Sequence, residues 1–202
     1  MSRRLVSRDV GRTEVLHRAA TAIAERGYHG MSMRDLARST GRGLASFYHL
    51  FRSKEDILFE LQQRAFLELC ATAEASLASS GQPSTRLHLF IENHVRFVVE
   101  QPDIMRVLVQ EASALPPSSR AVIRSLKLRY FEIGERLVGA VGGGADTGDV
   151  EDPLEIERAT YCMFGMLNWI FGWYEPARHG TPTALAKTIF DVIVSGIAGG
   201  RR

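Results

Sequence analysis

The chain has 202 residues, of which 45% are hydrophobic and 24% are charged, close to the values of globular proteins. This composition excludes a disordered or low-complexity chain, and the length allows one or two domains with a buried core. The formal net charge of +2 indicates no particular partner by itself.

Positive charge is concentrated at the N-terminal end. Residues 1–64 contain 12 Lys and Arg against 7 Asp and Glu, whereas residues 65–202 contain 13 against 16. This distribution is expected of a surface that faces phosphates, although a solvated face gives the same pattern. The first twelve residues lack the apolar segment of a secretory signal.

Neither a disulfide nor a membrane segment is predicted. The two cysteines, Cys70 and Cys162, lie far apart in apolar helical contexts, which favours two buried, reduced thiols in a cytoplasmic protein. The longest apolar stretch, residues 164–174, is too short to cross a bilayer, so we expect no membrane partner.

Apolar residues recur at helical spacing, and no segment shows the alternation of a strand. The pattern predicts a first helix that ends near Gly27, which suits a C-terminal cap. A second helix is expected up to about Thr40, since Ser32 followed by Asp35 is the signature of a capped start. Gly41 ends it, and a short helix follows over residues 44–51.

A long helix is expected from about residue 54 to 79, with Ser53 as its N-cap. Further helices are predicted over residues 85–100, 103–113, 118–140, 154–175 and 182–198, separated by loops that contain Pro or Gly. Residues 142–152 are expected to form a flexible acidic loop. The sequence thus predicts an all-α protein of about nine helices, divided near residue 54 into domains 1–54 and 55–202.

Residues 33–54, MRDLARSTGRGLASFYHLFRSK, form the most informative segment. They predict two short helices joined by a tight turn, with basic and aromatic residues on them. In a helix-turn-helix, the second helix enters the major groove while the first crosses the backbone. This segment therefore indicates a DNA-binding protein.

The stretch from about Val15 to Phe59 resembles the TetR family of transcriptional repressors. The resemblance rests on AERGY at residues 24–28, MRDLA at 33–37, Gly41, SFYHLF at 46–51 and SKEDIL at 53–58. It implies an N-terminal three-helix DNA-binding domain and a C-terminal domain for effector binding and dimerisation. It also implies a repressor that a small molecule releases from a palindromic operator.

The resemblance assigns roles to individual residues. It places Phe47 and Phe51 in the core, as anchors of the second helix, whereas Tyr48 and His49 are expected to face the DNA backbone. The residues expected at the DNA are Arg34, Arg42, Gly43, Leu44, Ala45, Ser46, Tyr48, His49 and Lys54.

Two positions depart from the family pattern, which usually has a small apolar residue followed by Ser or Thr where this chain has Arg42 and Gly43. Glycine is tolerated as an N-cap. Arg42 can reach a guanine edge or bind a phosphate, and the sequence leaves both open. Ahead of the first helix, a basic arm is expected either in a minor groove or as a solvated tail; it contains Arg3, Arg4, Arg8 and Arg12.

The helices predicted over residues 154–175 and 182–198 are apolar on more than one face, so all their sides must be covered. One face is expected to pack on its own bundle and the other on a second copy of the chain. A buried central helix of a monomer gives the same pattern. Because a two-fold DNA reader needs two recognition helices, we favour a homodimer through the last two helices.

Polar residues among large apolar ones indicate a small-molecule pocket, although each is also explained as plain core. The candidate lining residues are Phe66, Phe90, His94, Phe97, Met105, Leu108, Phe131, Met163, Asn168 and Trp169. Segments such as MRVL at 105–108 and MLNW at 166–169 are similar to TetR-family members that respond to acyl-CoA thioesters or fatty acids. An effector of that class is therefore implied.

The sequence has no nucleophile elbow, no phosphate-binding glycine loop and no run of metal ligands. We therefore predict neither an enzyme nor a cofactor or metal. The main alternative is a helical interaction protein that does not bind DNA, for which Arg42 and Gly43 are the only hint; a small enzyme comes third. Repression and activation are not distinguished by the sequence.

Overall fold

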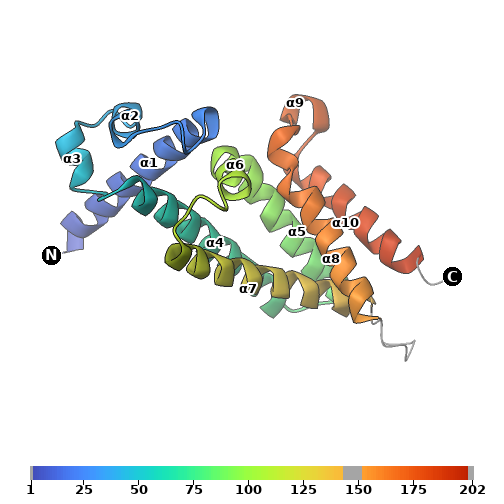
Figure 1. The fold of residues 1–202 in the computed structure, drawn as a ribbon. Helices are drawn as coiled ribbons and strands as arrows, with labels where there is room; N and C mark the ends of the chain where they lie inside the picture. Colours follow the sequence, from blue (N-terminus) through green and yellow to red (C-terminus); the bar gives the residue numbers. More distant parts are fainter. Residues whose placement is uncertain (1, 143–151, 200–202) are drawn as a thin grey trace. The chain divides into compact units, whose positions relative to one another are not determined.

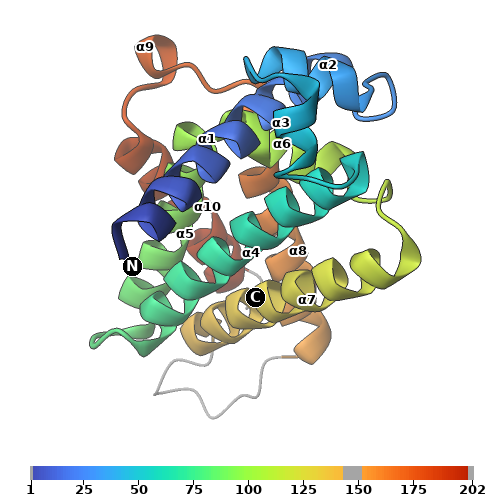
Figure 2. The ribbon, with the colours of Figure 1, turned by 90° about the vertical axis from the view of Figure 1, so that its left-hand side faces the viewer.

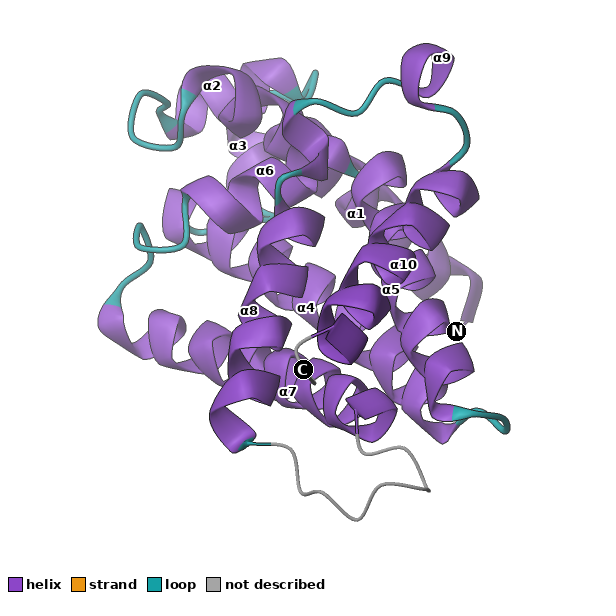
Figure 3. Ribbon diagram, turned by 90° about the vertical axis from the view of Figure 1, so that its right-hand side faces the viewer, coloured by secondary structure: helices purple, strands orange, loops and turns teal. Residues whose placement is uncertain are grey.

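The computed structural model describes residues 2–142 and 152–199, and over these ranges it contains helices and loops but no strand (Figures 1 and 3). The all-α class predicted from the sequence is confirmed. None of the helices in these ranges is both long enough and apolar enough to cross a membrane. In chain order the helices are α1 (Ser2–Arg26), α2 (Met33–Ser39), α3 (Leu44–Tyr48), α4 (Lys54–Ala78), α5 (Pro83–Glu100), α6 (Pro102–Gln110), α7 (Pro117–Gly142), α8 (Pro153–Asn168), the 3-10 turn η1 (Ile170–Gly172), α9 (Pro176–His179) and α10 (Pro182–Gly199).

The helices form two compact units. The first contains Met1–Ala65 and Asp103–Arg124, and therefore includes α1, α2, α3, the first half of α4, α6 and the start of α7. The second contains Phe66–Pro102 and Ser125–Arg202. The functional boundary near residue 54 stays a prediction, because these units describe packing and not activity.

In the first unit, α2 and α3 lie beside α1 (Figure 2). The apolar face predicted for the first helix is buried, with Ala19 and Ala20 at 0% exposure and Ile23 at 1%. This packing fixes where α3 presents its side chains.

In the second unit, α5 packs against α8, η1 and α10. Gly134 of α7 lies against α8, since a Cβ at this position would be only 3.1 Å from the Phe164 ring and 3.3 Å from Met163. Glycine therefore allows the large side chains of α8 to reach α7. The Phe164 ring placed in this way belongs to the aromatic cluster described below.

The end of α8 corrects the prediction of one helix over residues 154–175. The helix stops at Asn168, a 3-10 turn follows, and α9 begins at Pro176. A Cβ on Gly172 would lie 3.3 Å from the Trp169 ring nitrogen, so this glycine makes room for a tight turn under the indole. The apolar pattern continues through the turn, which is why periodicity alone did not reveal it.

Three smaller boundaries also differ. The short helix expected over residues 44–51 ends at Tyr48. The helix expected over residues 103–113 ends at Gln110. At the N-terminus, α1 already begins at Ser2, so the expected basic arm is part of a helix. The acidic loop expected over residues 142–152 lies mostly outside the described residues; within them, Asp152 caps α8 by accepting from the Leu154 amide at 3.0 Å.

Candidate DNA-binding surface, effector site and dimer face

The start of α2 is fixed by reciprocal hydrogen bonds, as the sequence predicted. The Asp35 amide donates to Ser32 Oγ at 3.2 Å, and the Ser32 amide donates to Asp35 Oδ2 at 3.0 Å. The Ser32 hydroxyl also donates to this carboxylate, and these hydrogen bonds lower the pKa of Asp35. Because two otherwise unpaired amides of the first turn are satisfied, the short helix has a defined beginning.

The turn between α2 and α3 depends on one glycine. Gly41 has φ +71°, in the left-handed region where glycine is favoured. Its amide donates to Arg38 O at 3.1 Å, and the next amide, of Arg42, donates to Ala37 O at 3.0 Å. Both bonds satisfy carbonyls at the end of α2, so the chain can turn sharply into α3.

Helix α3 has one buried side and one exposed side. Phe47 is 0% exposed and lies 5.6 Å from the ring of Phe51, which is 1% exposed. The pair holds the five-residue helix in the core, as the resemblance implied. Ala45, Tyr48 and His49 are exposed and share one face because they are three and four residues apart.

The structure places the predicted DNA contacts in two groups. The exposed group is Arg34, Gly43, Ala45, Ser46, Tyr48 and His49, and the partly exposed group is Arg42, Leu44 and Lys54. The Arg42 guanidinium lies close to α1, since a Cβ on Gly11 would be 3.5 Å from its Nη2. A contact of Arg42 with a guanine edge or with a phosphate stays a prediction.

Lys54 has a structural role that the sequence did not suggest. Its Nζ donates to the carbonyls of Tyr28 at 2.9 Å and Met31 at 3.0 Å, and lies 4.2 Å from the centre of the Tyr28 ring. The lysine therefore holds the loop between α1 and α2 onto the start of α4. The phosphate contact predicted for Lys54 stays a prediction.

Arg12 also differs from its expected place in a basic arm. Its Nη1 donates to Leu50 O at 2.6 Å, its Nε donates to Glu60 Oε1 at 2.7 Å, and a second bond joins Nη2 to Glu60 Oε2. The guanidinium lies 4.4 Å from the centre of the Phe51 ring. Arg12 therefore connects α1 to α4 and to the segment after α3.

We expect Glu60→Gln to lower the free energy of unfolding of the first unit at pH 7 by about 1–2 kcal/mol, because it weakens this partly buried, charge-assisted pair. Burial alone would raise the pKa of Glu60, but the hydrogen bond and charge of Arg12, together with Arg64, lower it. A lowered folded-state pKa gives stability that is present above the unfolded value of about 4.3 and is lost as the pH falls through the folded value.

Urea unfolding followed between pH 7 and pH 3 would measure this effect. The difference between Glu60→Gln and wild type should shrink as the medium becomes acidic. Glu25→Gln, at an exposed glutamate on α1 in the same unit, is the matched control. A difference that stayed constant down to pH 3 would show that the Glu60 charge is not responsible.

Glu111, just after α6, connects two further segments of the first unit. Its Oε1 accepts from the Tyr28 amide at 3.0 Å, and its backbone carbonyl accepts from Gln62 Nε2 at 3.2 Å. On α6, Asp103 Oδ2 accepts from the Thr21 hydroxyl at 2.6 Å. Helix α6 and the residue just after it are thus hydrogen-bonded to α1, to the loop before α2 and to α4.

In the second unit, a buried aromatic cluster surrounds one polar pair. His94 of α5 is 1% exposed, and its Nδ1 lies 2.9 Å from the Tyr130 hydroxyl of α7. Phe90, Tyr130 and Phe164 lie with ring centres 5.2–6.0 Å apart. Burial lowers the pKa of His94 to about 3, so the imidazole is neutral at pH 7.

The structure brings together only part of the predicted effector site. Phe90, His94, Phe131 and Met163 meet around Phe164. Tyr130 and Phe164 were missed; a histidine inside an apolar helix requires a partner, but the sequence does not say which residue supplies it.

The other predicted lining residues lie elsewhere. Phe66 and Phe97 are buried in the second unit, and Lys127 Nζ lies 5.6 Å from the Phe66 ring centre. Met105 and Leu108 are buried in the first unit. Asn168 is half-buried, whereas Trp169 is 55% exposed, lies with its ring tilted against Phe171 at 5.3 Å, and lines the groove described next.

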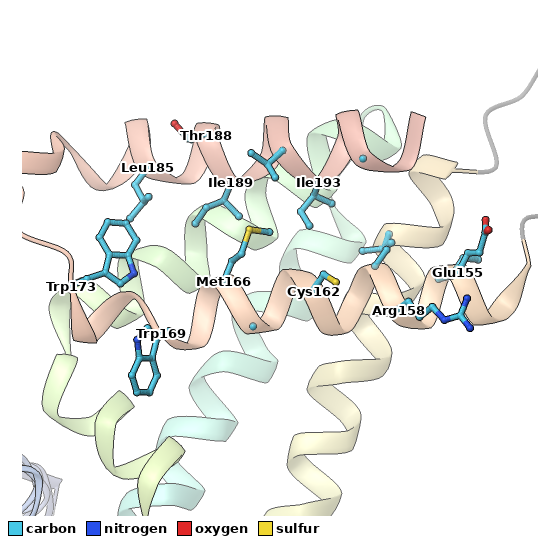
Figure 4. A pocket seen from close by; sticks show the side chains of 16 residues that line it. Glu155, Arg158, Cys162, Met166, Trp169, Trp173, Leu185, Thr188, Ile189 and Ile193 are labelled. Carbon is cyan, nitrogen blue, oxygen red and sulfur yellow. The ribbon is translucent and has the colours of Figure 1, made fainter. Parts of the chain in front are cut away.

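An apolar groove of about 1020 Å³ runs between α8 and α10. In Figure 4, Cys162 and Met166 of α8 point toward Ile189 and Ile193 of α10 across this space. Cys162 is exposed, which corrects the expectation of two buried thiols; Cys70 is buried. The large apolar side chains exposed on these helices and the turn after α8 are Leu154, Tyr161, Trp169, Trp173 and Val192.

A capped helix-turn-helix whose second helix has an exposed face is the architecture of a DNA-binding regulator. Comparison with known proteins assigns the chain to the same class. The family description "Bacterial regulatory proteins, tetR family" matches residues 15–61, and "Tetracyclin repressor-like, C-terminal domain" matches residues 80–197. The chain belongs to the TetR family.

Several relatives are similar over almost the whole chain. The fatty acid metabolism regulator protein of Bacillus subtilis is 23% identical, over 91% of this chain and 94% of its own length. The transcriptional repressor KstR2 of Mycobacterium tuberculosis is 28% identical, over 92% of each. The structure of AibR in complex with isovaleryl coenzyme A and operator DNA has a TM-score of 0.74, with 23% identity, 92% of this chain and 96% of that one covered.

Proposed function

We propose that this protein is a cytoplasmic, homodimeric repressor that binds a two-fold operator through α3 and is released by an acyl-CoA or fatty-acid effector. It acts by binding and not by catalysis. The observation that carries the proposal is the exposed face of α3, held by the buried Phe47 in a chain of the TetR family. Residues 1–54 are the DNA-binding domain, and residues 55–202 bind the effector and the second subunit.

The exposed side chains support the DNA-binding role. Tyr48 is 49% exposed, and Arg34 and Arg38 of α2 are exposed on the preceding helix. Hydroxyl, imidazole and guanidinium groups bind phosphates and so fix a helix in register on the duplex. With Ala45 and Ser46 small, the backbone of α3 can approach the floor of the groove.

The groove between α8 and α10 supports the dimer. Trp169 and Val192 are each 55% exposed, and Trp173 is 44% exposed, on neighbouring parts of one surface. Apolar surface of this kind is a mark of an interaction site. A second copy of the chain would cover it and would bring a second α3 to the operator.

Two comparisons support the effector class. One relative is named a fatty acid metabolism regulator, and AibR is seen with isovaleryl coenzyme A and operator DNA. The cluster around His94 is a largely apolar environment with a few polar groups, as small-molecule sites usually are. Helix α4 belongs to both units, so it is a direct covalent link between effector domain and DNA reader.

The mechanism follows from differential affinity. An effector changes operator binding only by as much as it prefers one state of the dimer to the other. We propose that the effector favours a state in which the two α3 helices no longer fit both half-sites.

Fluorescence anisotropy with the DNA upstream of the protein's own coding region tests this function. We expect specific binding that weakens steeply with salt and is released by a long-chain acyl-CoA. Binding no tighter than to random DNA would contradict the regulator. Specific binding that neither acyl-CoA nor fatty acid changes would keep the regulator and exclude this effector class.

A charge change should alter the salt dependence in a defined way. We expect Arg34→Gln to weaken operator and random DNA similarly and to reduce the slope of log affinity against log salt by about 0.9, the value for one lost phosphate contact. Arg136→Gln, at an exposed arginine on α7, is the matched control and should leave the slope unchanged. An unchanged slope for Arg34→Gln would remove this residue from the DNA contacts.

A further inference from the structure

One ring nitrogen of His94 has no hydrogen-bond partner in the part of the chain that the structure describes. Its Nε2 is buried and, among the described residues, no hydrogen-bonding group reaches it, whereas Nδ1 is bonded to Tyr130. A buried polar atom without a partner costs stability, so such an atom in a native protein calls for a cause. Because the residue is 1% exposed, bulk water does not supply the missing bond.

The pair with Tyr130 indicates what this nitrogen offers. The imidazole is neutral, since burial lowers the pKa of His94, and burial also raises the pKa of Tyr130, so the phenol keeps its proton. If the Tyr130 hydroxyl donates to Nδ1, the proton of the imidazole is on Nε2. Within this pair, the Nε2–H group is then the one donor that has no partner among the described residues. The opposite tautomer would leave both Nε2 and the hydroxyl proton without partners, because the described residues give Tyr130 no other acceptor.

A neutral Nε2–H donor that lies among aromatic rings favours an uncharged acceptor. The rings around His94 are those of Tyr130 and Phe164, with ring centres 5.8 and 6.2 Å away. A carbonyl oxygen needs one hydrogen bond there and brings no charge. A carboxylate would have to lose its water, or else His94 would have to take up a proton against its lowered pKa.

A row of aromatic rings leads from the surface to this donor. Tyr161 of α8 is 60% exposed, and its ring centre lies 4.7 Å from that of Phe131. Phe131 is half-buried and lies 5.6 Å from Phe164, which in turn faces His94.

Resting on the proposed function, we propose that His94 Nε2–H, oriented by Tyr130, is the specificity determinant of the effector site and binds an uncharged carbonyl oxygen. The effector class is then a thioester, ester or ketone on an apolar chain, and the free carboxylate is discriminated against. The apolar chain would lie along the row of rings from Tyr161 through Phe131 to Phe164.

Isothermal titration calorimetry with four twelve- or thirteen-carbon probes tests this. They are lauroyl-CoA, its thioether analogue S-dodecyl-CoA, the ketone 2-tridecanone and laurate. We expect wild type to bind the thioester about tenfold more tightly than the thioether, as one hydrogen bond to a carbonyl implies. We expect it to bind the ketone at least about tenfold more tightly than laurate, because the carboxylate has to lose its water. In His94→Phe the thioester-to-thioether ratio should fall to near one, and in Tyr130→Phe it should fall in part. The ketone-to-laurate ratio should stay above one in both, because the carboxylate still has to lose its water.

Two matched substitutions separate the donor from general packing. His88→Phe makes the same change at a half-buried histidine on the same helix, and Tyr161→Phe removes an exposed hydroxyl. Both should keep the wild-type ratios. If His94→Phe does not fold, the ratios measured for wild type and for Tyr130→Phe still test the assignment of His94, because neither measurement depends on that variant.

Each outcome has a distinct meaning. Equal binding of thioester and thioether, or laurate binding as tightly as the ketone, would overturn the assignment of His94 while leaving the effector class intact. Ketone binding that is weakened about tenfold in His94→Phe, with no binding of either CoA compound, would support the assignment and remove the CoA part of the proposed function. Binding of no probe would overturn the assignment and the effector class together, and operator binding, measured separately, would still stand.

Discussion

We expect Phe47→Ala to abolish specific operator binding at protein concentrations that saturate the operator with wild type. The side chain is fully buried and anchors α3 through Phe51. Removing a buried phenylalanine costs about 3–5 kcal/mol, from lost burial and from the cavity that remains. Helix α3 has only five residues and no side-chain N-cap, so it has little stability of its own once this anchor is lost.

Anisotropy with the operator, together with circular dichroism on heating, would measure this effect. Tyr48→Ala is the matched control on the same helix, since its side chain is 49% exposed. It should weaken binding without changing the melting temperature, because it removes a surface contact and not a core residue. Phe47→Ala with operator affinity within twofold of wild type would show that α3 does not depend on this anchor.

Placing a charge on the groove between α8 and α10 should separate the subunits. Val192 is 55% exposed on α10 and lines this groove, so in the proposed dimer it is buried against the partner. Val192→Arg would bury an unpaired guanidinium there, which disfavours association. Because two linked half-sites give about 10²–10⁴ in affinity over one, operator affinity should fall by a factor of this order.

Analytical ultracentrifugation would report the mass, and anisotropy the operator affinity, on the same sample. Leu128→Arg is the control, because Leu128 of α7 is also 55% exposed and does not line the groove. It should leave both quantities unchanged. A Val192→Arg variant that remains a dimer would place the interface elsewhere on the molecule.

The sequence predicted the DNA-binding end well because its signals are local. The pair Ser32 and Asp35, three residues apart, predicted the capped start of α2, and the structure shows both hydrogen bonds. Gly41 marked the turn for the same reason: a left-handed residue is needed at one position, and glycine adopts it readily.

Longer-range features could not be predicted in this way. Arg12 pairs with Glu60, 48 positions away, and a run of arginines near the N-terminus instead suggested a free arm. The partner of His94 lies 36 positions further along the chain, on α7. Periodicity indicates which face of a helix is buried, but it does not say which other helix covers that face.

The discontinuity of the first unit has a consequence for how the chain folds during synthesis. Asp103–Arg124 complete a unit that begins with Met1–Ala65, and residues 66–102 of the other unit are made in between. At a usual rate of about 5–20 residues per second, α2 and α3 therefore leave the ribosome seconds before Asp103 and Glu111, which accept hydrogen bonds from Thr21 of α1 and from the Tyr28 amide before α2. A nascent chain that stops at residue 65 contains α2 and α3 without the segment that completes their unit, and the proposed dimer face on α8 and α10 follows later still. Tight operator binding should therefore be acquired only after α10 has emerged.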